Sequence, residues 1–172
     1  MINSIDNDTV KEAILCKQIY PLALEELLCQ HQWQFAMRTV ALNIVVDPTF
    51  VSTYPYVFQI PSDCLLVVQC TAQNYVITGN KLETANKEVT LRYVARVDNP
   101  LHMPAYFREA LVLVLALKLC TAITDNATMY QQLYPEAQAA VVKARFLDDK
   151  QRALQYLDMT NDLSDARAGR SL

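Results

Sequence analysis

The sequence of 172 residues predicts an α+β fold: a helical bundle with an inserted small antiparallel β unit and a C-terminal polar arm. Three observations support this. Apolar residues recur at spacings of three and four near the two ends, they alternate one by one in the middle, and the last residues are polar and weakly patterned. We therefore expect the bundle at residues 1–38 and 99–157, the β insert at 39–98 and the arm at 158–172.

The first predicted helix covers residues 8–33. Thr9 and Glu12 have the spacing of a capping box, in which each side chain satisfies a free backbone N–H of the other residue. Pro21 lies inside this helix, where it cannot donate a backbone hydrogen bond and its ring crowds the preceding turn. We therefore expect a kink at Pro21.

Short strands are predicted across residues 39–98. Gly79-Asn80 suits a two-residue hairpin turn, because such turns need positive φ angles. The alternation after residue 63 predicts one strand face made of Cys64, Leu66, Val68 and Cys70. The clearest amphipathic strand follows, with an apolar face made of Val89, Leu91, Tyr93, Ala95 and Val97.

Two further helices are predicted at residues 104–124 and 127–157. The run "ALVLVLAL" at 110–117 makes the first of them apolar nearly all round, so we expect it to be surrounded on most sides. Pro135 is expected to start or kink the main part of the second. A coiled-coil-like seam on that helix is predicted at Leu133, Ala137, Ala140, Ala144, Leu147, Gln151 and Leu154. The arm after residue 157 is expected to be extended or disordered when free.

Composition excludes several classes of function. The formal net charge of −3 disfavours sequence-independent binding of nucleic acid. The two glycines cannot form a Gly-rich phosphate-binding loop of either common kind. Five cysteines without a CxxC motif are typical of buried thiols in a reducing compartment. The longest apolar run is far shorter than a membrane span, so no membrane partner is expected.

The segment "PSDC" at residues 61–64 is the one candidate for nucleophilic chemistry. A serine or cysteine nucleophile needs a base within hydrogen-bond reach and an oxyanion hole. No glycine lies near these residues, and neither His31 nor His102 belongs to a recognisable catalytic or metal-binding motif. A turn between two strands is the favoured interpretation of this segment. No catalytic residue, metal site or cofactor is predicted.

Charged residues on the last helix have two interpretations. Lys143 and Lys150 are seven residues apart, and Asp148 and Arg152 are four apart. They form either a solvated face or a contact with an adjacent subunit. Because charged residues make up only 19% of the chain, surplus apolar surface favours some burial against other subunits. The candidate subunit or portal interface comprises Lys143, Arg145, Lys150, Arg152, Arg167 and Arg170.

The order of several segments resembles the tail tubular protein A family, the head-to-tail adaptor or gatekeeper proteins of short-tailed bacteriophages. These segments are "LCKQIYPLALEELLCQHQWQFAMRTVAL", "YVFQIPSDCLLVVQC", "YVITGNKLET", "VTLRYVARV" and "MPAYFREALVLVLALKL". The likeness covers about residues 5–157. No single segment is specific, whereas the ordered series is.

The resemblance implies a structural virion protein without catalysis or cofactor. Such a protein forms a ring, expected to be a dodecamer, between the portal protein and a tail nozzle similar to tail tubular protein B. It is assembled in the host cytoplasm, and genomic DNA passes through its channel without specific binding. The polar arm would reach toward the portal.

Two alternatives stay open. One is a head-completion or connector protein of a long-tailed phage, against which the inserted β unit argues. The other is a small thiol enzyme built around Cys64, which would need a thiol with a depressed pKa.

Overall fold

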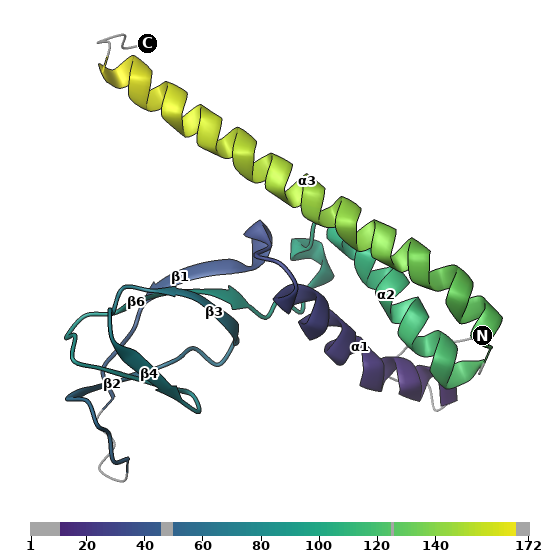
Figure 1. Ribbon diagram of the computed structural model, residues 1–172, viewed down its shortest axis with the longest axis horizontal. Coiled ribbons are helices and arrows are strands. Elements are labelled where there is room, and N and C mark those ends of the chain that lie inside the picture. Colours follow the sequence, from purple (N-terminus) through teal and green to yellow (C-terminus); the bar gives the residue numbers. More distant parts are fainter. Residues whose placement is uncertain (1–10, 46–49, 125, 168–172) are drawn as a thin grey trace. The chain divides into compact units, whose positions relative to one another are not determined.

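The computed structural model describes residues 11–45, 50–124 and 126–167, with side chains as far as Leu154 (Figure 1). The fold is α+β, as predicted. The chain divides into two compact units: a helical unit of residues 1–24 and 103–172, and a β unit of residues 25–102. The long helices are α1 (Lys11–Cys29), α2 (Ala105–Ile123) and α3 (Ala127–Arg167).

The strands and two short 3₁₀ helices all lie in the β unit. The 3₁₀ helices are η1 (Gln34–Ala36) and η2 (Pro100–His102). The strands are β1 (Met37–Ala41), β2 (Tyr56–Gln59), β3 (Cys64–Cys70), β4 (Tyr75–Thr78), β5 (Lys81–Thr84) and β6 (Thr90–Ala95). They form two antiparallel sheets of three strands, with orders β1-β6-β3 and β2-β5-β4.

The first helix ends earlier than the sequence predicts. α1 stops at Cys29 rather than residue 33, and the indole nitrogen of Trp33 donates a hydrogen bond of 2.8 Å to the carbonyl oxygen of Leu27. The indole thus satisfies a carbonyl of the last turn that a longer helix would have bonded internally. Pro21 lies within α1, and the helix continues past it. Thr9, and with it the predicted capping box, lies outside the described residues.

The last helix is longer than predicted. α3 begins after Asn126, whose side-chain oxygen accepts hydrogen bonds from the backbone N–H groups of Thr128 and Met129. Pro135 neither starts the helix nor ends it, since α3 runs from Ala127 to Arg167. The prediction of an extended arm is therefore wrong for residues 158–167, which contain no proline or glycine to stop a helix. Residues 168–172 lie outside the described residues.

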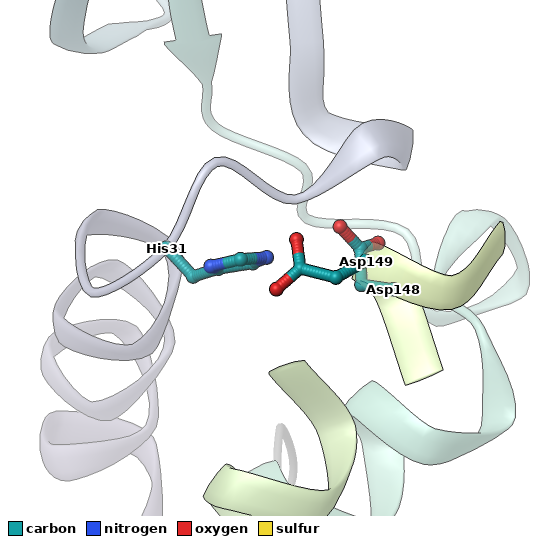
Figure 2. A group of neighbouring side chains, drawn as sticks. All are labelled: His31, Asp148 and Asp149. Atoms are coloured by element: carbon teal, nitrogen blue, oxygen red, sulfur yellow. The ribbon is translucent and has the colours of Figure 1, made fainter. Parts of the chain in front are cut away.

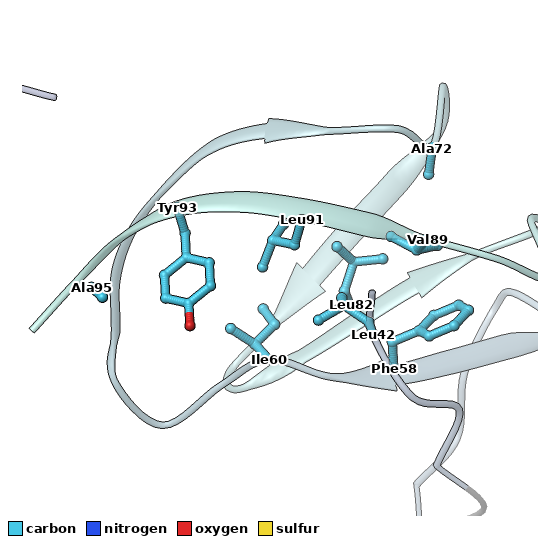
Figure 3. Close-up of a cluster of buried hydrophobic side chains, with 9 residues drawn as sticks. All are labelled: Leu42, Phe58, Ile60, Ala72, Leu82, Val89, Leu91, Tyr93 and Ala95. Carbon is cyan, nitrogen blue, oxygen red and sulfur yellow. The ribbon is translucent and has the colours of Figure 1, made fainter. Parts of the chain in front are cut away.

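The core of the β unit is formed by inward side chains of both sheets (Figure 3). The predicted apolar face of β6 is confirmed, because Leu91, Tyr93 and Ala95 are buried in this core. Its members are Leu42, Phe58, Ile60, Ala72, Leu82, Val89, Leu91, Tyr93 and Ala95. The hairpin prediction is also confirmed: β4 and β5 are joined by Gly79-Asn80, and Gly79 has a φ of +62°.

The predicted face of β3 is wrong. The pairing of β3 with β6 shifts register between Cys64 and Leu66, and again between Val67 and Gln69. These irregularities change the side-chain period, so that Cys64, Val67 and Cys70 pack against the core while Leu66 is 43% exposed. Simple alternation had placed Leu66 on the same face as Cys64 and Cys70.

A buried carboxylate joins the loop before β2 to β5. Glu83 is only 5% exposed, and its carboxylate accepts hydrogen bonds from the hydroxyls of Ser52 at 2.6 Å and Thr78 at 2.7 Å. The backbone N–H of Thr53 lies 3.3 Å from the same group. These donors, the Ser52 hydroxyl first, hold the pKa of Glu83 below its usual value.

We expect Glu83→Gln to destabilise the protein near neutral pH and to matter less in acid. Because the folded pKa is lowered, the carboxylate stabilises the fold above its unfolded pKa of about 4.3, and this contribution is lost as the pH falls through the folded pKa. Urea unfolding of both proteins at neutral pH and at about pH 3 measures the difference. Glu88→Gln, at an exposed position, is the control. An equal difference at both pH values would contradict this account.

Candidate assembly surface

α2 is covered on only part of its circumference by the described residues. Its buried residues are Phe107, Ala110, Leu111 and Cys120. Val112 is 63% exposed, and every residue from 113 to 119 is only half-buried. The expectation that this apolar helix is surrounded on most sides therefore holds only in part: the described residues leave the side that carries Val112 open. In the described residues, no helix is both long enough and apolar enough to cross a membrane.

α2 lies along the N-terminal half of α3 (Figure 1), and the buried residues of α3 at this contact are mostly small. The predicted seam is confirmed at Ala137, Ala140 and Ala144, which are all buried. It does not continue to Gln151 and Leu154, which are exposed. The reason is length: α2 begins at Ala105, and its first turn already lies beside Asp148.

A polar contact closes the seam at that end. The hydroxyl of Tyr106 donates to the carboxylate of Asp148 at 3.0 Å, and it also lies 3.2 Å from the side-chain oxygen of Gln151. Asp148 is fully buried, and the guanidinium of Arg152 donates to it at 3.3 Å. Burial, followed by the bond to Asp148, raises the pKa of Tyr106. Figure 2 shows Asp148 next to Asp149 on α3.

The opposite side of α3 carries an exposed apolar strip. We define the outer strip as Ala139, Val142 and Phe146, at helical spacings of three and four. Val142 is 62% exposed and Phe146 is 66% exposed. This strip was not predicted, because the seam was the one apolar pattern followed along this helix. The sequence feature that could have revealed it is the recurrence of Ala139, Val142 and Phe146 at helical spacings, on the side of the helix opposite the seam.

The predicted charged residues are partly paired within the chain. Lys143 lies 3.2 Å from the carboxylate of Glu109 on α2, and Lys150 is exposed. Arg152 pairs with Asp148 at 3.3 Å and with Asp149 at 3.8 Å. The pair of Lys143 with Glu109 is exposed and contributes little to stability, whereas Arg152 binds a carboxylate, that of Asp148, which is fully buried.

The other predicted interface residues lie in different settings. Arg145 is half-buried on α3. Arg167 is the last residue of α3, and Arg170 lies outside the described residues. The described charged candidates therefore all lie on α3. They do not form a row of unpaired cations, because Lys143 and Arg152 bind carboxylates of the same chain.

The segment at residues 61–64 forms a turn in which the backbone N–H of Cys64 donates to the carbonyl of Pro61. The carboxylate of Asp63 accepts a hydrogen bond of 3.0 Å from the hydroxyl of Tyr93, and burial together with Asp63 raises the pKa of Tyr93 to about 12. Burial, followed by the charge of Asp63, also raises the pKa of the Cys64 thiol. A raised pKa opposes thiolate chemistry. His102 ends η2, and His31 follows α1 in a bend.

We expect Tyr106→Phe to lower the free energy of unfolding by about 1–3 kcal/mol, because it removes a donor from a buried carboxylate. Equilibrium unfolding in urea, followed by circular dichroism, measures the change. Tyr130→Phe, at the more exposed start of α3, is the matched control and should change stability by less than about 0.5 kcal/mol. Equal effects of the two substitutions would show that the bond to Asp148 contributes nothing.

Comparison with known proteins assigns no family to this chain. No protein-family model matches it, and no curated protein matches it. The likeness to the tail tubular protein A family therefore depends on the ordered sequence segments alone.

Proposed function

We propose that this protein is a structural virion protein, a head-to-tail adaptor that forms a ring between portal and tail nozzle around the DNA channel. One observation carries the proposal: α2 and α3 expose large apolar side chains, among them Val112 at 63%, Val142 at 62% and Phe146 at 66%. The ordered likeness to the tail tubular protein A family supports the same function from the sequence.

The outer strip is the best candidate for the contact between subunits. Val142 and Phe146 are exposed by 62% and 66%, and burying each against a neighbour would contribute about 1.5–3 kcal/mol. The strip lies on one side of α3, and the half-covered apolar residues of α2 belong to the other helix of the hairpin. A contact between two different patches is head-to-tail, and it closes into a ring when its rotation allows.

The charge of the chain suits a channel through which DNA slides. The formal net charge is −3, and two of the candidate cations, Lys143 and Arg152, already face carboxylates of the same chain. A ring of such subunits offers few unpaired cations for phosphate groups. Weak, non-specific contact with passing DNA follows, because phosphate binding scales with the number of neutralising cations.

The C-terminal half of α3 is the candidate portal contact. From Gln151, whose side chain still lies 3.2 Å from the hydroxyl of Tyr106, to Arg167 the helix extends past its buried residues, over about 25 Å at 1.5 Å per residue. A helix presents its residues in a fixed order along one direction, so it reaches a partner at lower entropic cost than an extended arm would. The sequence of this half is polar and includes Arg167.

The thiol-enzyme alternative has lost support, since burial and the Asp63 carboxylate raise the pKa of Cys64 instead of lowering it. The connector of a long-tailed phage remains an alternative of the same structural class. The two-sheet β unit inserted between helices argues for the short-tailed type.

We expect the double substitution Val142→Asp and Phe146→Asp to prevent ring formation on purified portal without unfolding the chain. The loss of two buried apolar side chains removes roughly 3 kcal/mol or more per contact, about a hundredfold in affinity. Electron microscopy of the mixture scores rings, and thermal unfolding verifies the fold. The control is Val51→Asp with Leu101→Asp, at two apolar positions of the β unit that are 95% and 86% exposed. If the outer-strip variant still forms rings, the outer strip is not the contact between subunits.

We expect truncation after Leu157 to spare folding and to abolish attachment to heads that carry the portal. Co-sedimentation with such heads measures attachment. A full-length chain with Arg167→Gln and Arg170→Gln serves as the matched variant, because it keeps the length and removes two charges. If the truncated protein attaches with unchanged affinity, the C-terminal half of α3 is not the portal contact.

A further inference from the structure

β4 ends the sheet β2-β5-β4, and its outer side is open. The other edge of this sheet is covered, because the backbone N–H of Val45 donates to Val57 at 2.8 Å and that of Gln59 donates to Asn43 at 3.3 Å. Beyond β4, the described residues supply no further strand. The sheet therefore has one protected edge and one open edge.

The register of the hairpin identifies which backbone groups face outward. A two-residue loop makes Thr78 and Lys81 a hydrogen-bonded pair, and such pairs alternate with non-bonded ones along the strands. Val76 and Glu83 are therefore bonded to each other through their backbones. The N–H and C=O groups of Tyr75 and Ile77 point away from β5, toward the open side.

Apart from its short length of four residues, β4 carries none of the features that usually protect an edge strand. Such strands are guarded by charged side chains, proline or bulges. β3, at the edge of the other sheet, has two register irregularities, and β1 carries Arg38. β4 is uncharged and unbroken, and Tyr75, Val76 and Ile77 are 39%, 47% and 41% exposed. This strand is suited to pairing with another.

We propose that β4 pairs antiparallel with β4 of a second copy of this chain, about a two-fold axis at Val76. Tyr75 of each copy then lies opposite Ile77 of the other, and their outward N–H and C=O groups form four backbone hydrogen bonds. The two sheets become one sheet of six strands. A two-fold contact satisfies both open edges at once and leaves no edge for further growth.

Charge favours a second copy as the occupant. Identical strands bring identical side chains near the axis, so any charge on β4 would face a like charge. β4 has none, and the nearest carboxylate, Glu83 on β5, is buried and bonded to Ser52 and Thr78. A charged partner strand would find no counter-charge on β4. The dimer does not depend on the proposed ring, which uses α2 and α3.

Cysteine cross-linking tests the register directly. Residues opposite each other in a non-bonded antiparallel pair have Cα atoms about 4.5 Å apart, within the range of a disulfide. In a Cys29→Ser background, which removes an exposed thiol, Val76→Cys should oxidise to a covalent dimer. Ile77→Cys is the matched control, because its nearest counterpart is Tyr75 rather than itself. Equal cross-linking of the two variants, or none at Val76→Cys, would overturn the proposal.

Sedimentation equilibrium of the full chain provides a second readout. The wild-type protein should dimerise with rising concentration, and Val76→Lys should abolish this by placing like charges at the axis. Thr39→Lys, exposed on β1, should leave the dimer intact. If the wild-type protein is monomeric at every concentration, a second copy is not the occupant of the β4 edge. The same conclusion follows if the β4 amides are protected from hydrogen exchange only when portal or nozzle is added.

The same substitutions separate the dimer from the ring. Val142→Asp with Phe146→Asp should still dimerise through β4, and Val76→Lys should still form rings on the portal. If Val76→Lys abolished both dimer and rings, a two-fold contact at β4 independent of the ring would be refuted.

Discussion

The mismatch in length between α2 and α3 determines most of what the helical unit can do. α2 has 19 residues and α3 has 41, so α2 covers about half of its partner. The covered half has a seam of alanines that lets the two backbones approach closely. The uncovered half has no described partner within the unit, and its sequence is polar. One short helix thus separates a packing segment from a projecting segment.

Both ends of the covered half are marked by polar side chains. Asn126 caps the start of α3, and the Tyr106–Asp148 bond lies where α2 begins. Buried hydrogen-bonded groups contribute little net stability, but leaving one partner unpaired is expensive. The Asn126 bonds lie within α3, so the Tyr106–Asp148 bond is the one of the two that joins the helices and favours one register of their packing. The apolar seam holds the two helices together, and the Tyr106–Asp148 bond favours one alignment of them.

In the β unit, too, apolar packing and polar contacts have separate roles. Its apolar core holds the two sheets together, and the buried carboxylate of Glu83 ties the loop before β2 to β5. The bond from Tyr93 to Asp63 joins β6 to the turn that precedes β3. The same turn was the candidate for thiol or serine chemistry. Its acidic residue has a structural partner, which accounts for an aspartate beside a cysteine without invoking catalysis.

Local patterns were predictable, and features that depend on distant partners were not. The hairpin of β4 and β5 follows from Gly79-Asn80, and the face of β6 follows from simple alternation. The irregular register of β3 depends on its pairing with β6, which alternation along one strand does not encode. The end of α1 depends on Trp33, six residues beyond the carbonyl it binds. At the candidate surface, the charged residues were predicted and the outer strip was not, because exposure depends on where α2 lies.

The projecting half of α3 also has a mechanical consequence. A helix that is packed along one half and projects along the other behaves as a rigid rod held at one end, the clamp. A small rotation at the clamp therefore displaces its far end. Over about 25 Å, a tilt of about 10° at the clamp moves the tip by about 4 Å. The Tyr106–Asp148 bond lies at the clamp, so a slight repacking there becomes a displacement of side-chain size at the tip. Such a rod can follow small changes in the position of a bound partner while the β unit keeps its own fold.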